Sequence, residues 1–460
     1  MHREMSLPYP AHETHVYQSR RARVLQWMQA QGGGVAILPT GGLRSRNGTN
    51  PYPFRFDSQF YYLTGFVEPE AWLVLIAKAD GSSKSILFCQ PKDPETEIWD
   101  GLRFGPEAAR EIFGFDQAQA TDELASYLSS ALLGESTVFA PLHRSAIENL
   151  PAQIQRWVDA ARKQAKGLQQ VPWRWLDLTP ALSQHRLVKD IQEQALMRQA
   201  AEIAAAGHCQ AMRAAKPGLT ERFLEAELLR VFLQAGAQDT AYQSIVAVGA
   251  NACILHHQAG SSVMRDNDLV LIDAGCELHG YASDITRTFP VSGRFTGPQA
   301  ALYDIVLAAQ QAAVAQTRPG VSFNAGHEAA VAVLSQGLID EGILSGSLDD
   351  VIENKRYQPF YMHRTGHWLG LDVHDVGSYR LIENDVEEPE WRALEPGMVL
   401  TIEPGLYVRP AENVPEAFWD IGIRIEDDAL VTAQGCDLLT RGVPVDRHSI
   451  EAIVQQVSVD

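Results

Sequence analysis

Residues 269–293 read LVLIDAGCELHGYASDITRTFPVSG, in which two apolar runs each carry an aspartate on either side of a tight turn. The run from Leu269 to Ile272 is apolar enough for a buried strand, so the carboxylate of Asp273 at its end is unusual. We predict an antiparallel hairpin with its turn centred between residues 278 and 279. That register places Asp273 directly opposite Asp284 on one face of the sheet.

Two ionised carboxylates that face each other across a hairpin repel, so this pair needs a compensating group. A shared proton, an arginine or a divalent cation would serve. Arg287 has the opposite strand parity to Asp284, so its side chain is predicted on the other face of the strand. A metal ion is therefore the favoured partner of the two aspartates.

Two later strands also deliver carboxylates. Residues 396–405 read PGMVLTIEPG and place Glu403 directly after an apolar strand that stops at a Pro-Gly pair. Residues 421–428 read IGIRIEDD, so alternation puts Arg424 and Glu426 on one face and the isoleucines on the other. A charged face on so apolar a strand indicates an interior polar cavity, although a solvated sheet face is an equal alternative for Glu426 alone.

Three of the 14 histidines fall within the run HRTGHWLGLDVH, residues 363–374. The spacing of His363 and His367 resembles a helical metal motif, but two glycines in the run argue against a helix. A lone histidine is more often structural than functional. Clustering with glycines and apolar neighbours reverses that expectation, and His256, in a His-His pair, is a further candidate.

The candidate ligands carry a combined charge that two divalent cations would balance. Four carboxylates and one neutral imidazole sum to −4; the residues are Asp273, Asp284, His367, Glu403 and Glu426. Oxygen-rich ligation with one nitrogen suits Mn²⁺, Co²⁺ or Zn²⁺ and excludes Cu⁺ and iron–sulfur clusters. A metal pair of this kind polarises a carbonyl oxygen and activates water. The residues alone therefore lead to a dinuclear hydrolase and no further.

Composition excludes several classes of protein. The 460 residues contain 38 Lys+Arg and 57 Asp+Glu, and the net charge of −19 argues against nucleic acid and against anionic membranes as partners. The five cysteines form no C-x-x-C pair, so neither a disulfide framework nor a thiolate zinc site is expected. The start of the sequence has no apolar signal region, and no apolar run reaches membrane-spanning length. We expect a cytoplasmic protein.

The chain is predicted to be α/β (α+β) with two domains. Residues 1–186 alternate helices with apolar strands at 34–38, 71–76 and 137–140, and end in a polar connector at 166–186. The region 187–460 shows helices followed by strands twice over. This rhythm predicts two related halves that contribute strands to one cavity.

These motifs resemble those of proline-specific metallopeptidases of the pita-bread fold, and in particular the bacterial Xaa-Pro aminopeptidases (aminopeptidase P). The matching runs are residues 269–293, 366–377, 394–407 and 422–428, while 54–75 and 97–101 resemble that subfamily's N-terminal domain. The resemblance implies a creatinase-like α/β domain at 1–186, for substrate access and oligomer contacts. It implies a pita-bread catalytic domain with pseudo-two-fold halves at 187–460.

The resemblance also implies a role for each candidate metal ligand. Asp273 would bind one metal, and Asp284 and Glu426 would bridge both. His367 and Glu403 would complete the shell of the other metal, and Glu403 is the expected general base. The implied metal is Mn²⁺, with Zn²⁺ or Co²⁺ as alternatives.

Further matched positions are implied to handle the substrate. His363 and His374 would act catalytically on the scissile carbonyl; the implied substrate-binding residues are His256, Arg424, Tyr407 and Trp99. Trp99 matches a tryptophan that reaches a neighbouring subunit's active site in tetrameric members, so a homotetramer is expected, with a dimer as the alternative.

Two features depart from the family pattern. Arg364 stands where a small residue is common after the first histidine. The segment 378–390, with its acidic stretch at 383–390, is longer than expected and is predicted to affect peptide length preference or oligomer contacts.

The implied function is removal of the N-terminal residue from peptides with proline in the second position. The nearest alternative is an Xaa-Pro dipeptidase (prolidase), which shares the metals and the chemistry. A metal-free creatinase-like amidinohydrolase and a non-catalytic pita-bread binding protein are disfavoured, because all five ligands are present.

Overall fold

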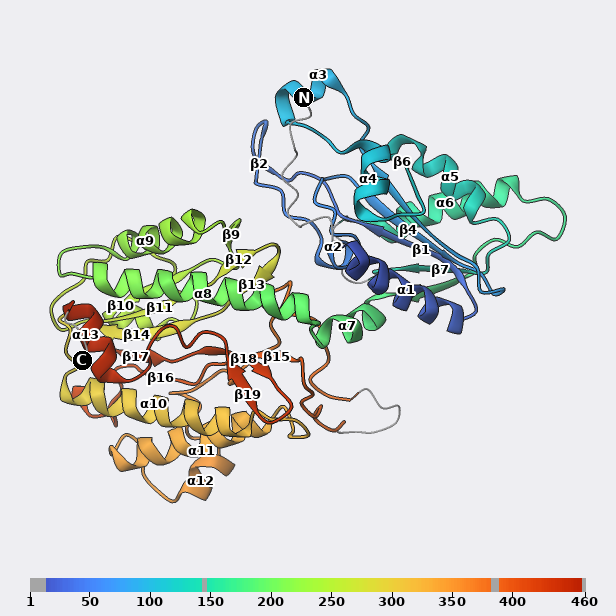
Figure 1. Ribbon diagram of the computed structural model, residues 1–460. Helices are drawn as coiled ribbons and strands as arrows, with labels where there is room; N and C mark the ends of the chain where they lie inside the picture. Colours follow the sequence, from blue (N-terminus) through green and yellow to red (C-terminus); the bar gives the residue numbers. More distant parts are fainter. Residues whose placement is uncertain (1–13, 143–146, 382–388, 457–460) are drawn as a thin grey trace. The chain divides into compact units, whose positions relative to one another are not determined.

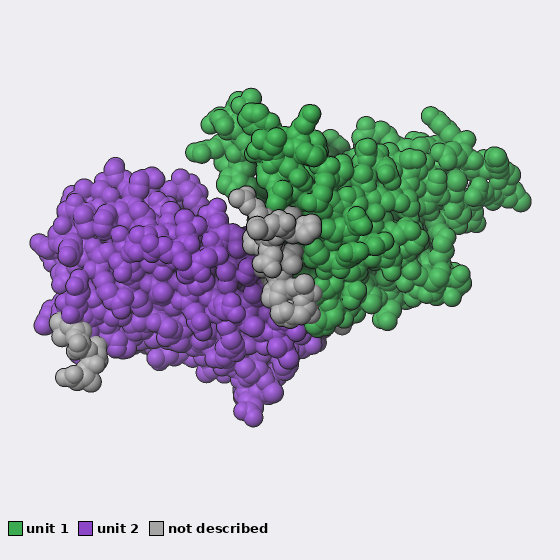
Figure 2. Space-filling model, turned by 45° about the horizontal axis from the view of Figure 1, so that its top comes forward, with its two compact units in different colours: residues 1–186 green, residues 187–460 purple. Residues whose placement is uncertain are grey.

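The computed structural model describes residues 14–142, 147–381 and 389–456. It divides into two compact units, Met1–Arg186 and Leu187–Asp460 (Figure 2). Each unit has a hydrophobic core of its own. Within the described residues, no helix combines the length and the apolar character that crossing a bilayer requires.

The N-terminal unit is built on a six-stranded sheet of order β6-β5-β4-β1-β7-β8. Its strands are β1 (Gly34–Pro39), β4 (Trp72–Ala77), β5 (Ser83–Cys89), β6 (Gln117–Ala120), β7 (Thr137–Ala140) and β8 (Arg174–Asp177), with a separate pair β2 (Ser45–Asn47) and β3 (Asn50–Pro51). Its helices are α1 (Thr14–Ala30), α2 (Ser58–Thr64), α3 (Pro94–Asp100), α4 (Gly105–Phe113), α5 (Leu124–Ala131), α6 (Leu150–Gln164) and α7 (Thr179–Leu187). Apolar side chains of α5 and α6 pack on one face of the sheet, and α1 lies on the other (Figure 1).

The prediction of a connector over residues 166–186 is wrong. This segment contains β8, which pairs parallel to β7 at the sheet edge, and most of α7. β8 was not predicted because it is shorter than a typical strand. It has only four residues, RWLD, and each of them is only partly buried.

The C-terminal unit has two helix pairs with strands between them (Figure 1). Its helices are α8 (Ile191–Ala214), α9 (Glu221–Gln234), α10 (Gly297–Gln316), α11 (Ala325–Asp340), α12 (Leu348–Glu353) and α13 (Arg447–Gln455). Its strands are β9 (Asp239–Thr240), β10 (Ile245–Val248), β11 (Leu269–Asp273), β12 (Cys276–Leu278), β13 (Tyr281–Ala282), β14 (Thr286–Pro290), β15 (Val399–Ile402), β16 (Gly405–Val408), β17 (Ile421–Arg424), β18 (Asp427–Val431) and β19 (Cys436–Leu438). The pair α8–α9 precedes one group of strands and the pair α10–α11 precedes the other, as the sequence rhythm predicted.

The predicted register of the β11–β14 hairpin is wrong by two residues. Asp273 lies opposite Thr286, not opposite Asp284. The turn is centred on His279 and Gly280, which both have positive φ (49° and 82°), as a two-residue hairpin turn requires. Asp284 therefore lies diagonally across from Asp273, in the short break between β13 and β14, and on the same face.

Gly275 allows this diagonal approach. A Cβ atom at position 275 would lie 1.6 Å from the carbonyl oxygen of Ser283, well inside van der Waals contact. The backbone around it is fixed by a hydrogen bond from the Ala274 N–H to the Ile285 carbonyl. Any side chain here would push the strand that ends in Asp273 away from Asp284.

Gly275→Ala is expected to lower the free energy of unfolding by about 3 kcal/mol or more and to weaken metal binding, because the hairpin must open to admit the methyl group. Urea unfolding and titration with Mn²⁺ measure the two effects. Gly435→Ala is the control, because a Cβ there meets nothing within 4 Å. Wild-type stability and metal affinity in Gly275→Ala would show that the close approach is unimportant.

Candidate metal centre

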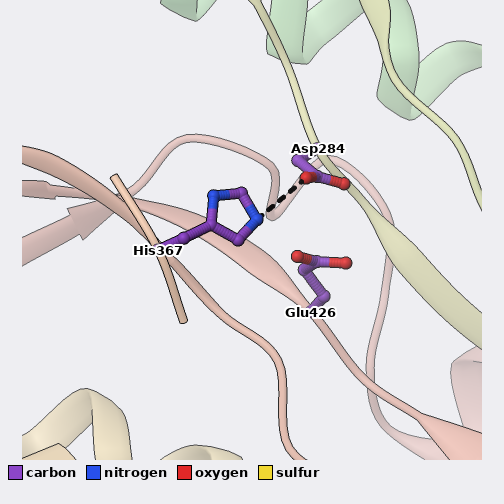
Figure 3. Close-up of side chains that lie close together, drawn as sticks. All are labelled: Asp284, His367 and Glu426. Carbon is purple, nitrogen blue, oxygen red and sulfur yellow. Dashed lines mark ion pairs between the residues drawn. The ribbon is translucent and has the colours of Figure 1, made fainter. Parts of the chain in front are cut away.

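Three potential ligands from distant parts of the chain meet at one point (Figure 3). Each of the three residues Asp284, His367 and Glu426 offers one ligand atom, and these three atoms lie within 4.8 Å of one another. The Nε2 atom of His367 lies 3.5 Å from Oδ2 of Asp284, and both carboxylates are buried. Asp284 precedes β14, His367 lies in the loop before β15, and Glu426 joins β17 to β18.

Asp273 and Glu403 extend this cluster. The hydroxyl of Tyr242 donates to Oδ1 of Asp273 at 2.5 Å and also contacts Oδ1 of Asp284, so it ties the two aspartates together. Oε1 of Glu403, which follows β15, lies 3.7 Å from Nε2 of His367. The structure thus gathers all five predicted ligands.

Burial and mutual repulsion shift the pKa values of these carboxyl groups. Burial, together with Asp284 and Asp273, raises the pKa of Glu403 to about 7, although His367 and Arg424 oppose the shift. Burial and the neighbouring carboxylates also raise the pKa of Glu426 well above its ordinary value. The cluster therefore favours bound positive charge.

Asp273 behaves differently from the other acids. Burial raises its pKa, but the Arg424 guanidinium and the hydrogen bond from Tyr242 together lower it below the ordinary value. Nη2 of Arg424 lies 2.5 Å from Oδ2 of Asp273. Arg424, predicted as a substrate-binding residue, thus also contacts a predicted metal ligand.

The donor set fits divalent metal ions. The ring of His367 contacts the Trp368 carbonyl through Nδ1 at 3.0 Å, which assigns a proton to Nδ1, so that Nε2, which faces the carboxylates, can bind a metal once it has lost its own proton. Ligand histidines at metal sites are commonly held in this way. Thr286 supports the opposite side by donating to Oε2 of Glu426 at 2.6 Å.

Three supporting residues were not predicted from the sequence. Thr286 shares strand parity with Asp284, so alternation could have found it. Tyr242 and Asp428 gave no signal, because their contacts depend on long-range packing. Asp428 accepts a hydrogen bond from the Asp284 N–H at 3.1 Å, and its other carboxyl oxygen, Oδ1, is buried with no hydrogen-bond partner among the described residues.

A cavity of about 800 Å³ opens beside the cluster. Its lining includes the five predicted ligands with His256, His363, His374 and Arg424. Nε2 of His363 is 2.8 Å from the Tyr407 hydroxyl, and the ring of His374 lies 4.2 Å from that of His367. Burial lowers the pKa of His363 to about 4, so its imidazole is neutral at neutral pH.

The remaining predicted features are Trp99, Arg364 and the segment 378–390. Trp99 belongs to the N-terminal unit, where it is 86% exposed on α3. Arg364 lines the cavity. Most of the acidic stretch at 383–390 lies outside the described residues, which stop at residue 381 and resume at 389.

Comparison with known proteins identifies the family. Residues 195–433 match metallopeptidase family M24, and residues 17–139 match the aminopeptidase P N-terminal domain. The chain belongs to metallopeptidase family M24. It is 41% identical to the Xaa-Pro aminopeptidase of Haemophilus influenzae, over 95% of this chain and 96% of that protein, and 42% identical to the Escherichia coli enzyme of the same name, over 95% and 97%.

A solved aminopeptidase structure shares the fold over nearly the whole chain. The structure of Pseudomonas aeruginosa aminopeptidase PepP matches with a TM-score of 0.90 and 43% identity, covering 98% of this chain and 99% of that one. This agreement confirms an aminopeptidase P N-terminal domain followed by a pita-bread catalytic domain. Membership in M24 implies divalent metal ions as cofactors, in keeping with the donor set.

Proposed function

We infer that the chain is a metalloaminopeptidase that removes the N-terminal residue from peptides with proline in the second position. The observation that carries this inference is the set of five ligand side chains around one cavity, in a chain that also has the aminopeptidase P N-terminal domain. The curated relatives at 41–42% identity are named Xaa-Pro aminopeptidases. The metal-dependent hydrolysis of a peptide bond matches the chemistry of the donor set.

The proposed site holds two divalent ions, with Mn²⁺ as the proposed native metal and Zn²⁺ or Co²⁺ as alternatives. Asp273 would serve one ion, His367 and Glu403 the other, and Asp284 and Glu426 both. When bound, the metals would activate water and polarise the scissile carbonyl. The combined ligand charge of −4 supports this stoichiometry.

Side chains of the protein would orient the peptide and move its protons. Glu403, which lines the cavity 3.7 Å from His367, would accept a proton from water and pass it on. His363 and His374 would hydrogen-bond the scissile carbonyl. His256 would help to position the same carbonyl, and Arg424 and Tyr407 would bind the end of the peptide that contains proline.

Prolidase activity is the main alternative, because it needs the same metals and ligands. The match of residues 17–139 to the aminopeptidase P N-terminal domain supports the aminopeptidase. Hydrolysis of an Xaa-Pro dipeptide and an Xaa-Pro-Xaa tripeptide by the Mn²⁺-loaded protein separates the two. Cleavage of the dipeptide alone would favour prolidase, and cleavage of neither would argue for a different function.

We place the enzyme in the cytoplasm. The five cysteines are free thiols in the described structure, in keeping with a reducing compartment.

A homotetramer in which a neighbouring subunit contributes Trp99 is the proposed assembly. Trp99 and Ile98 are 86% and 81% exposed, and two adjacent apolar side chains so exposed are typical of a contact surface. Light scattering is expected to give about four times the 50.7 kDa chain mass, and Trp99→Ala to weaken tripeptide hydrolysis. A monomer with full tripeptide activity would contradict this assembly.

A further inference from the structure

One wall of the cavity combines aromatic rings with a guanidinium group. Phe323, Arg364, Tyr379 and Trp391 all line the cavity, and we call them the aromatic wall. The ring of Phe323 lies 4.7 Å from Tyr379 and 6.4 Å from Trp391, nearly parallel to the latter. The guanidinium carbon of Arg364 lies 4.9 Å from the centre of the Trp391 ring, within cation–π range.

Arg364 is held in place by a chain of polar contacts. Its Nη2 atom donates to Oδ1 of Asn324, and Nδ2 of Asn324 donates to Oε1 of Glu328 at 2.6 Å. The contact with Glu328 orients the Asn324 amide so that its oxygen faces the guanidinium. The side chain of Arg364 is therefore already ordered in the unliganded protein. Binding of a ligand would cost little further side-chain entropy at Arg364.

Most of the donors of Arg364 are available to a ligand. A guanidinium has five N–H donors, and within residues 14–142, 147–381 and 389–456 only Asn324 accepts a side-chain hydrogen bond from Arg364. No ion pair to Arg364 is found among the same residues. Arg364 is exposed and lines the cavity, so the remaining donors can meet a ligand there.

The backbone around Trp391 makes the wall rigid. Arg380 and Trp391 form an antiparallel bridge, and the Arg392 N–H donates to the Tyr379 carbonyl at 2.9 Å. The Arg380 guanidinium also lies 4.2 Å from the centre of the Trp391 ring and donates to the Pro389 carbonyl. Trp391 therefore offers a fixed surface against which Arg364 lies.

The cavity is lined by charged groups of both signs. In the metal-loaded protein the two proposed divalent ions would balance the charge of Asp273, Asp284, Glu403 and Glu426, whereas Arg364 has no ion-pair partner among the described residues. Arg364 follows directly after His363, which contacts Tyr407 at the proposed proline side. A peptide that extends past its proline would thus reach a cation.

We propose that Arg364, held against Trp391, binds a carboxylate of the peptide beyond its proline. The carboxylate is either the C-terminal one of a tripeptide or an acidic side chain in the third position. This proposal rests on the proposed function and names a preference of the same site: short peptides or peptides with an acidic third residue. Arginine suits carboxylate recognition because two of its N–H groups can bind both oxygens.

Calorimetry with product-like ligands tests the proposal without turnover. Pro-Gly and its C-terminal amide probe the terminal carboxylate; Pro-Asp amide and Pro-Asn amide probe the side chain. Wild-type metal-loaded protein is expected to bind the charged member of at least one pair about tenfold more tightly, the strength of one charge-assisted hydrogen bond. Arg364→Gln is expected to reduce that ratio to about one, and Arg364→Lys to retain part of it.

Arg318→Gln is the matched control, because Arg318 is exposed and absent from the cavity lining, and it should keep the wild-type ratio. Equal affinities for both members of both pairs in the wild type, or no binding of any ligand, would overturn the proposal. An unchanged ratio in Arg364→Gln, or equal weakening of charged and neutral ligands, would overturn it as well. Failure of the proposed function would appear separately, as no hydrolysis of any Xaa-Pro peptide by the wild type.

Discussion

Glu403→Gln is expected to lower kcat by about 10²–10⁴-fold, because the amide cannot accept the proton that general-base catalysis requires. Glu403 follows an apolar strand, lies 3.7 Å from His367, and has its pKa raised to about 7 by burial and neighbouring carboxylates. Glutamine keeps the shape of the side chain and one oxygen that can bind a metal. The fall in kcat therefore measures the loss of the negative charge and of the basicity of Glu403.

The measurement is kcat for a tripeptide at saturating Mn²⁺, with metal content determined on the same sample. Glu412→Gln, which makes the same chemical change at an exposed position outside the cavity lining, should keep the wild-type rate. If Glu403→Gln retained more than about a tenth of kcat with both metals bound, Glu403 would not be the base. His363 would then be the next candidate, since it lies 3.7 Å from Glu403 in the same cavity.

The five candidate ligands, which the structure brings around one cavity, were found from the sequence because their own segments make them conspicuous. Asp273 and Glu403 end strands that are otherwise apolar, and Glu426 alternates with buried isoleucines. A buried strand cannot end in an acid without a partner, so these positions reveal a polar cavity even when the fold is unknown.

Features that depend on backbone torsion or on distant packing could not be predicted in the same way. The observed hairpin register differs from the predicted one by two residues, because the turn is formed by His279 and Gly280, which adopt positive φ. Residue spacing alone does not distinguish this turn from the predicted one, which was centred between residues 278 and 279. Tyr242 bridges Asp273 and Asp284 from a segment outside every motif. Arg424 was predicted to face the substrate, but its contact with Asp273 appears only when β11 and β17 come together.

Removal of the divalent metals is expected to abolish hydrolysis, with a loss of at least about 10³-fold, because the metals supply several kcal/mol to the reaction. Chelation followed by dialysis, and restoration of the rate by Mn²⁺, is the measurement. Full activity in exhaustively dialysed, metal-free protein would contradict the dinuclear site.

The metal-free protein should also lose stability as the pH rises. Burial lowers the pKa of His367, but the hydrogen bond with Asp284 and the charges of Glu403 and Asp284 raise it overall, from 6.5 to about 9. A raised folded-state pKa stabilises the fold below pH 6.5, and that contribution is lost as the pH rises through about 9. Glu403 contributes in the same way at lower pH. Its pKa in the metal-free fold is raised from 4.5 to about 7, so its stabilising contribution is lost as the pH rises through about 7.

The window from pH 6.5 to about 8 isolates the metal centre. Closer to pH 9 the five cysteines also contribute, because burial raises their folded-state pKa values and the unfolded thiols ionise first; they are Cys89, Cys209, Cys253, Cys276 and Cys436. Below pH 6.5 the buried imidazoles of His208, His327 and His363, whose pKa values burial lowers to about 4, act in the opposite direction, because their protonation destabilises the fold. Between pH 6.5 and about 8 these three are mostly neutral in both the folded and the unfolded state, so the fall in melting temperature over that range reports His367 and the carboxylates beside it. Bound Mn²⁺ requires the same ligands deprotonated, so the stabilisation that Mn²⁺ confers should grow with pH across this window. Thermal melts with and without Mn²⁺ measure it, and a metal-free melting temperature that stayed level or rose would contradict the electrostatic argument.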